Sequence, residues 1–308
     1  MTRRYSPTVA ERQAREEARA QQVAQLHQQL TAGVLELVSG ESWQAMLTAA
    51  ARFHAYSWRN CLLILAQMPT ATRVAGYRTW QSLGRQVRKG EHGIAVLAPV
   101  TYRTNNQEEN TAEHDGEAAT VEDSAGRQIR GWKIEHVFDI SQTDGEPLPH
   151  IKASPVDGEA PQGLWDALAA EVAAAAFVLL REATPGRPNA NGSMTRGEMT
   201  VRVRDDLAPA QACKTLAHEL AHVELGHGTA SCTDTRSQAE VEAESVAYIV
   251  ASYAGLDTSG YSFPYIGHWA PAGKQADVLA DTAERVIATA RRILAGLDAH
   301  DPSVSSIS

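Results

Sequence analysis

One short pattern, His218-Glu219-Leu-Ala-His222, constrains the fold of this chain more than any other feature. Residues four apart on an α-helix lie one turn apart on the same face, so these two imidazoles can reach one metal ion. Glu219 follows the first histidine, where its carboxylate can contact a metal-bound water. The pattern therefore predicts a helix with two metal ligands and one acid–base group. Another segment of the same chain must supply a third ligand.

The residues around this pattern favour a helix. Pro209 suits a first helical turn, and Gly226 suits the end of a helix. An apolar stripe of helical period borders the two histidines and consists of Cys213, Leu216, Leu220 and Val223. A buried helix with two hydrogen-bonded histidines is the structural alternative, but the H-E-x-x-H spacing is typical of zinc peptidases.

The third ligand does not follow the metzincin pattern, in which a further histidine comes six residues after the second. That position holds Gly228, and His227 lies one residue too early. We therefore interpret His227 as structural or solvated and look for the ligand on a later element.

A helix expected over residues 237–251 offers Glu240 and Glu244 one turn apart on one face. We expect Glu240 to be the third ligand. Glu244 would accept a hydrogen bond from a ligand histidine or replace Glu240 as the ligand. An alternative for Glu240 is a capping role, because Ser237-x-x-Glu240 also matches a capping box.

Residues 199–204 predict a half-buried strand directly before the H-E-x-x-H helix. Apolar Met199, Val201 and Val203 alternate there with polar residues. Such a strand can be the sheet edge that receives an extended peptide, or an ordinary strand of a small sheet.

The C-terminal half resembles gluzincin-type metallopeptidases of the ImmA/IrrE and ArdC groups. Their two-part metal motif is matched by Lys214-Thr-Leu-Ala-His-Glu-Leu-Ala-His222 and Glu240-Val-Glu-Ala-Glu-Ser-Val-Ala-Tyr248. The segment Tyr261-Ser-Phe-Pro-Tyr-Ile-Gly-His-Trp269 is similar to one found after that motif. The region of the third ligand is closer to ImmA/IrrE than to plasmid ArdC proteins.

The N-terminal half resembles the single-stranded-DNA-binding domain of ArdC-type antirestriction proteins. Three segments carry this resemblance: Tyr56-Ser-Trp-Arg-Asn-Cys-Leu-Leu-Ile-Leu-Ala-Gln67, Val74-Ala-Gly-Tyr-Arg-Thr-Trp-Gln-Ser-Leu-Gly-Arg-Gln-Val-Arg-Lys-Gly-Glu-His-Gly-Ile94 and Val137-Phe-Asp-Ile-Ser-Gln-Thr-Asp-Gly145. ArdC-type proteins join this domain to a metallopeptidase domain in the same order. The resemblance covers about residues 20–300 and implies an antirestriction role.

Charge is unevenly distributed along a chain whose net charge is −9. The acidic total argues against non-specific DNA binding, but residues 41–100 hold seven arginines and lysines and only two acids. Cations and aromatic residues interleave there, which suits a surface that binds phosphates and stacks unpaired bases. The candidate DNA-binding residues are Arg73, Tyr77, Arg78, Trp80, Arg85, Arg88 and Lys89. The alternative is that Tyr77 and Trp80 belong to the core and the arginines form a solvated face.

The 308 residues are expected to form an α+β protein of two domains. We expect N-terminal helices with a small antiparallel sheet, followed by a zincin-like (gluzincin) peptidase domain. The expected divisions are a tail at 1–19, a DNA-binding domain at 20–145, a proline-rich linker at 146–162, a peptidase domain at 163–300 and a tail at 301–308.

Within these domains the periodicity predicts individual elements. Two amphipathic helices are expected over 20–68, strands over 93–100 and 132–140, and helices over 164–182 and 274–299. Residues 103–130 are polar and acidic and are expected to form a disordered insertion.

Three cysteines fit a reducing cytoplasm better than a disulfide framework. The chain begins without the apolar core of a signal peptide, and no apolar run is long enough to cross a membrane. We therefore expect a cytoplasmic protein without a membrane partner.

Together these features predict a single-stranded-DNA-binding zinc metallopeptidase of antirestriction type. Zn²⁺ would be held by His218, His222 and Glu240, and Glu219 would act as the general base. The candidate donors to the oxyanion are Tyr261, Tyr265 and His268. Two alternatives stay open: a DNA-binding antirestriction protein with a structural or inactive metal site, and a regulatory peptidase that cleaves a repressor-like protein. The expected partners are single-stranded DNA and a protein substrate that the sequence does not identify.

Overall fold

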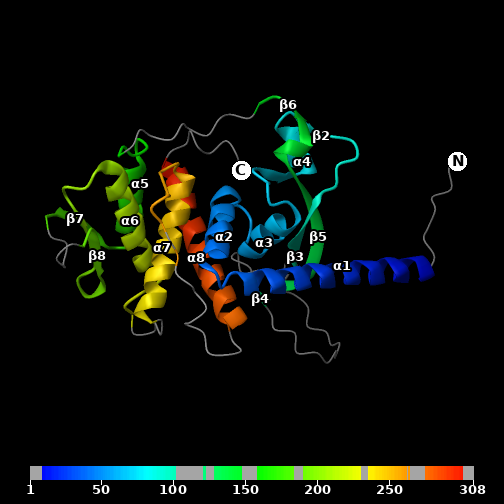
Figure 1. Ribbon diagram of the computed structural model, residues 1–308, viewed down its shortest axis with the longest axis horizontal. Coiled ribbons are helices and arrows are strands. Elements are labelled where there is room, and N and C mark those ends of the chain that lie inside the picture. The colour runs from blue at the N-terminus through cyan, green and yellow to red at the C-terminus, as the bar shows by residue number, and fades with distance from the viewer. Residues whose placement is uncertain are drawn as a thin grey trace, which may run out of the picture.

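The computed structural model describes residues 9–101, 121–122, 128–147, 158–183, 190–229, 235–261, 263 and 275–300. Long helices occupy the middle of the molecule, with a sheet beyond them on either side (Figure 1). This arrangement confirms the predicted α+β class. Within the described part of the chain, no helix combines the length and the apolarity that crossing a bilayer requires.

Three helices begin the chain: α1 (Val9–Glu36), α2 (Gly40–Arg52) and α3 (Trp58–Gln67). Helix α1 starts inside the segment that we expected to be a tail, and the region expected to hold two helices holds three. The reason lies in two serine caps, since the hydroxyls of Ser39 and Ser57 accept hydrogen bonds from backbone N–H groups and start α2 and α3.

The N-terminal half contains a four-stranded antiparallel sheet in which β5 pairs with β1, β3 and β4. Its strands are β1 (Val74–Gly76), β3 (Ile94–Thr101), β4 (Val121–Glu122) and β5 (Gln128–Asp139). The two strands predicted in this half are thus confirmed. A ribbon of β2 (Arg85–Val87) and β6 (Thr143–Gly145) lies beside the short helix α4 (Tyr77–Ser82). Most of the expected acidic insertion lies outside the described residues.

Two side-chain amides of α3 close the outer edge of β3. The Asn60 amide accepts from the Leu97 N–H and donates to the Leu97 carbonyl, both at 2.9 Å. Gln67 makes the same pair of hydrogen bonds to Ala95, at 2.8 and 2.9 Å. An open strand edge would offer these backbone groups to another chain. Here helix α3 takes the place of the next strand.

The described residues of the C-terminal half form four α-helices and a three-stranded sheet of order β7-β9-β8. The helices are α5 (Leu164–Ala174), α6 (Pro209–Glu224), α7 (Arg236–Tyr253) and α8 (Gln275–His300). The strands are β7 (Val178–Glu182), β8 (Gly192–Thr195) and β9 (Thr200–Arg204), with β7 parallel and β8 antiparallel to β9. The predicted helices around the H-E-x-x-H pattern, around Glu240 and at the C-terminal end are confirmed.

One expectation for this half was wrong, and one of two alternatives is excluded. The helix expected over residues 164–182 ends at Ala174, because Ala176 adopts a left-handed backbone (φ 63°) and the following residues pair with β9 as strand β7. The strand at 199–204 is not a sheet edge, because β9 lies in the centre with β7 and β8 on its two sides. The strand at the edge next to helix α6 is β8.

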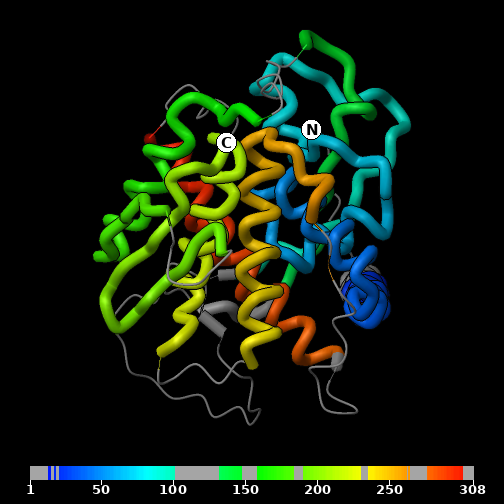
Figure 2. The backbone as a smooth tube through the Cα atoms, turned by 60° about the vertical axis from the view of Figure 1, so that its left-hand side comes forward, coloured from blue at the N-terminus to red at the C-terminus, as the bar shows by residue number. Residues whose placement is uncertain are grey.

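One hydrophobic core runs through both halves of the chain. Helix α7 lies between α6 and α2, and α8 packs against it (Figures 1 and 2). Trp43 of α2 is fully buried and donates through Nε1 to Ser245 Oγ of α7 at 2.9 Å. One turn further along each helix, the hydroxyls of Thr48 and Tyr248 lie 2.8 Å apart. The division into two domains at a linker over 146–162 stays a prediction, since much of that segment lies outside the described residues.

Candidate metal centre

Two imidazoles on α6 and one carboxylate on α7 converge. His218 Nε2 lies 3.1 Å from His222 Nε2, and Glu240 Oε2 lies 3.5 and 3.8 Å from these two nitrogens. Ligand atoms about 2.1 Å from a tetrahedral zinc ion lie roughly 3.4 Å apart, which is close to all three separations. Two nitrogens and one oxygen also match the donors that zinc prefers. The structure therefore brings the three predicted ligands into an arrangement that fits one divalent metal ion.

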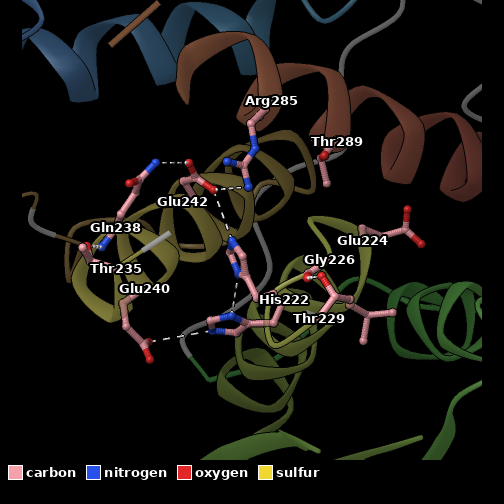
Figure 3. Close-up of polar contacts among 12 residues, drawn as sticks. His222, Glu224, Gly226, Thr229, Thr235, Gln238, Glu240, Glu242, Arg285 and Thr289 are labelled. Atoms are coloured by element: carbon pink, nitrogen blue, oxygen red, sulfur yellow. Dashed lines mark hydrogen bonds and ion pairs between the residues drawn. The ribbon is translucent and has the colours of Figure 1, made fainter. Parts of the chain in front are cut away.

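The start of α7 excludes the capping alternative for Glu240. The N-cap residue is Thr235 and not Ser237, and the Thr235 hydroxyl accepts a hydrogen bond from a backbone N–H. The Glu240 side chain instead reaches toward the histidines (Figure 3). Glu244 Oε2 lies 2.9 Å from His218 Nδ1, which leaves the other ring nitrogen of His218 facing Glu240.

Glu219 follows His218 in the chain and is only 7% exposed. The backbone N–H of Met194 in β8 lies beside its carboxylate and favours the charged form. Burial raises the pKa of Glu219 to about 7, while His218 opposes this rise and the charge of Glu240 adds to it. A carboxylate with a pKa near neutrality is suited to take up a proton and release it again.

Sequence reasoning missed the strand that contacts Glu219. A Cβ atom on Gly192 would lie 2.6 Å from Thr215 Cγ2 and 2.9 Å from Glu219 Oε1, so glycine lets β8 approach α6 this closely. The four residues of β8 include a single large apolar side chain, Met194, so no strand period identifies the segment. The glycine was the one available signal.

His218, His222 and Glu240 form a triad of candidate ligands. Carboxylates in and beside this triad stabilise positive charge. Burial lowers the pKa of His218, but hydrogen bonds to Glu240 and Glu244 outweigh burial and raise this pKa to about 10. Burial lowers the pKa of His222. Hydrogen bonds from both histidines hold the pKa of Glu240 well below its usual range. This balance of charge is what a site for a cation requires.

Of the three candidate oxyanion donors, Tyr261 is among the described residues, whereas Tyr265 and His268 lie outside them. The Tyr261 ring packs edge-on against Tyr248, with ring centroids 5.4 Å apart. Burial raises the pKa of the Tyr261 phenol, and the charge of Glu244 adds to this rise. The phenol is therefore a neutral hydrogen-bond donor, and its role in the reaction stays a prediction.

Trp80 differs from our expectation for the DNA-binding residues. It is 1% exposed and donates through Nε1 to the Phe138 carbonyl at 2.9 Å. The predicted role as a stacking platform is wrong, because α4 packs against β1 and β5 and the indole is enclosed there. Trp80 belongs to the core.

Arg85 and Arg88 hold the β2–β6 ribbon together. Arg85 donates to the side-chain and backbone oxygens of Thr143 at 2.8 and 3.1 Å. Arg88 lies 2.8 Å from Glu91 and also donates to the Ser141 carbonyl. Much of their hydrogen-bonding capacity is used within the protein, which reduces what they could contribute to phosphate binding.

An open groove with a volume of about 850 Å³ lies beside this ribbon. Its lining residues are Tyr77, Gln86, Val87, Arg88, Lys89, Glu91, Phe138 and Asp144. Tyr77 is 43% exposed and packs edge-on against Phe138. Arg78 and Lys89 are exposed, and Arg73 is half-buried. An exposed aromatic ring beside an exposed lysine is a minimal unit for one stacked base and its phosphate.

Two protein families each match a part of the chain. The N-terminal domain of anti-restriction factor ArdC matches residues 16–138, and the IrrE N-terminal-like domain, a peptidase family, matches residues 177–259. Residues 16–138 are thus similar to an ArdC-type N-terminal domain, and residues 177–259 are similar to an IrrE-like domain. This finding confirms the ArdC-type assignment and the zincin-like C-terminal domain. The IrrE-like match contains the whole triad, whereas helix α8 lies outside both matched ranges.

Individual relatives are more distant. An uncharacterized protein of Bacillus anthracis is 26% identical over 287 residues, which cover 84% of this chain and 48% of that protein. The chain thus spans about half the length of the curated relative it matches. The metal-free crystal structure of the antirestriction ArdC protein from the R388 plasmid is 19% identical, with a TM-score of 0.46 over 80% of this chain and 86% of that one. The Mn(II)-bound structure of the same protein is 20% identical, with a TM-score of 0.45 over 80% of this chain and 84% of that one.

Proposed function

We propose that the chain is a zinc metallopeptidase in which His218, His222 and Glu240 hold the ion. A bound zinc ion supplies a Lewis acid that lowers the pKa of a coordinated water and polarises a peptide carbonyl. One observation carries the proposal: three ligand atoms converge next to a buried carboxylate, Glu219, whose pKa lies near neutrality.

In the proposed reaction, Glu219 acts first as general base and then as general acid. Its carboxylate takes a proton from the attacking water and passes it to the leaving amine. The Met194 N–H beside this carboxylate stabilises its charged form, in which it can accept the proton. The neutral phenol of Tyr261 is the candidate donor to the oxyanion among the described residues.

An extended peptide is the substrate class that suits the surroundings of Glu219. Strand β8 pairs with β9 along one edge, and among the described strands none covers its second edge. Met194 of β8 contacts Glu219, so a peptide that added to the second edge would run past the acid–base group. Backbone pairing of this kind favours an unfolded segment or a loop of a protein substrate.

The test compares the zinc-loaded full chain with Glu219→Gln on casein and on fluorogenic peptides. Both proteins should hold about one zinc per chain, because Glu219 is not a ligand. Glu219→Gln should lose hydrolysis by at least about 100-fold, since it removes the acid–base group. Wild-type protein that binds zinc and cleaves nothing would favour the alternative of a DNA-binding protein with a structural metal site.

We also propose that the ArdC-type domain binds single-stranded DNA at the groove that contains Tyr77 and Lys89. The ArdC match and the exposure of these two side chains support this role. Tyr77→Ala in the full chain should weaken binding of a labelled oligonucleotide by roughly 5- to 150-fold, because a stacked base contributes about 1–3 kcal/mol. The matched control is Trp132→Ala, because Trp132 is an aromatic residue of β5 with a similar exposed fraction (41%) and does not line the groove. Equal losses in both variants would place the DNA elsewhere.

The biological role depends on which protein the peptidase cleaves. An antirestriction role predicts cleavage or binding of components of a restriction system, whereas a regulatory peptidase would cleave a repressor-like protein. Digestion of both kinds of protein, with and without single-stranded DNA, separates these possibilities.

A further inference from the structure

We infer that His227 and Glu242 are positioning residues for the metal ligand His222, and that they hold its imidazole in the form whose Nε2 faces the ion. The inference rests on the proposed metal site. It goes beyond that site, because neither residue belongs to the triad or to the H-E-x-x-H pattern.

A line of hydrogen bonds leads from the triad into the interior (Figure 3). His222 Nδ1 lies 2.8 Å from His227 Nδ1, and His227 Nε2 lies 3.1 Å from Glu242 Oε2. Arg285 Nη2 of α8 lies 3.0 Å from the same oxygen, and Gln238 Nε2 donates to Glu242 Oε1 at 3.1 Å. Both oxygens of Glu242 are engaged, and Oε2 contacts the guanidinium of Arg285 as well as the imidazole of His227.

The line is buried along its middle. The side chains of His227 and Glu242 are 4% and 0% exposed. A carboxylate this far from water is costly unless charged and hydrogen-bonding partners surround it. Arg285 supplies the charge and Gln238 fills the second oxygen. The remaining partner of Glu242 Oε2, His227, connects this buried carboxylate to a metal ligand.

The base of the His227 side chain is also fixed. Its backbone N–H donates to the His222 carbonyl at 3.1 Å, and its own carbonyl accepts from Arg196 Nε at 2.9 Å. The turn that follows α6 is thereby tied to the last turn of that helix. Glu242 points away from the face of α7 that carries Glu240, so its carboxylate does not reach His222 itself. His227 connects the two side chains.

Donors and acceptors along the line fit one arrangement of protons. A ligand Nε2 on His222 carries no proton, so Nδ1 carries it and donates to Nδ1 of His227. The proton of His227 then lies on Nε2 and is donated to Glu242. The reversed neutral arrangement would set the unprotonated Nε2 of His227 against a carboxylate oxygen, where neither atom can donate. The buried carboxylate thus selects the metal-binding tautomer of His222.

The other ligand histidine is held differently. His218 Nδ1 contacts a carboxylate directly, but the side chain of that residue, Glu244, is 41% exposed. Water can replace part of this contact, whereas it has little access to the line behind His222. We therefore expect zinc affinity to depend more on His227 than on Glu244.

The experiment measures zinc affinity of the full chain by competition with a chromophoric chelator, so that it does not depend on peptide hydrolysis. His227→Phe retains a ring but removes both nitrogens and should weaken zinc binding by about 10- to 100-fold. Glu242→Gln retains an acceptor and should weaken it less, in the same direction. His54→Phe, a histidine packed on Tyr253 away from the triad, is the matched control and should bind zinc like wild type. Circular dichroism with chelator present checks that each variant folds.

Two results would decide against the inference. If His222→Ala abolished zinc binding while His227→Phe and Glu242→Gln stayed within about twofold of wild type, the ligand set would stand and the positioning role would be wrong. If His222→Ala bound zinc like wild type, the ligand set itself would be wrong, and the inference would fall with it. Weakening by Glu244→Gln equal to that by His227→Phe would remove the distinction between the two histidines.

Discussion

Replacing Asn60 with alanine should destabilise the protein far more than the same change at Gln67. Both amides make two hydrogen bonds to the edge of β3, at 2.8–2.9 Å. The bonds of Asn60 are buried and those of Gln67 are exposed. A buried backbone group left without a partner costs about 1–3 kcal/mol, so the two groups of Leu97 should cost about 2–6 kcal/mol. At Gln67 water can replace the lost partner, and we expect a loss of about 1 kcal/mol.

Urea unfolding followed by tryptophan fluorescence and by circular dichroism measures this difference. A protein of ordinary stability unfolds with about 5–15 kcal/mol, so Asn60→Ala should shift the urea midpoint clearly while Gln67→Ala shifts it slightly. The free energies are comparable if the slopes agree among the variants. A loss at Gln67 as large as that at Asn60 would refute the reasoning, because burial would then not determine the cost.

Three further predictions concern the core, the site and the pH dependence. Trp80→Ala should lower stability by about 3–5 kcal/mol, and weaker DNA binding at an unchanged melting temperature would contradict its place in the core. Gly192→Ala should retain zinc but reduce peptide hydrolysis by roughly 10- to 100-fold, because a displacement of about 1 Å is enough for such a loss; undiminished hydrolysis would show that β8 yields. Burial raises the pKa of Asp139, but hydrogen bonds from the Ser141 side chain and from three backbone N–H groups outweigh it and lower this pKa. Asp139 therefore contributes stability above the unfolded pKa of about 3.9 that is lost as the pH falls through the lower folded pKa. Urea midpoints at decreasing pH should fall less steeply for Asp139→Asn, and identical slopes would contradict this account.

The metal-binding helices could be predicted from the sequence because their signals are local. His218 and His222 are one turn apart, and Glu240 shares a face with Glu244, so helical geometry alone selects the candidates. The triad then needs only that α6 and α7 pack against each other. Glu242 comes two residues after Glu240, so the same helical geometry turns it away from the ligand face, and the structure places it behind the site, where it contacts His227.

Other features depend on contacts between distant residues and could not be predicted in this way. The alanine-rich segment continues in sequence past Ala174, but pairing with β9 converts residues 178–182 into a strand. The side on which Trp80 lies is decided by its contact with Phe138 of β5, 58 residues away in the sequence. Gly192 has meaning only once α6 lies against β8. In each case tertiary packing overrides the local pattern.

The contact of α2 with α7 means that the two halves are not interchangeable modules, although each half matches a family of its own. Helix α7 carries Glu240, yet Ser245 and Tyr248 of the same helix bond to residues of α2. A fragment beginning at residue 163 would leave those two side chains without their partners and uncover an apolar surface that invites association with other proteins. Exchange of one half between relatives would succeed only when both sides of this contact move together. Helix α7, which carries the third ligand, is therefore held in place by residues from both halves of the chain.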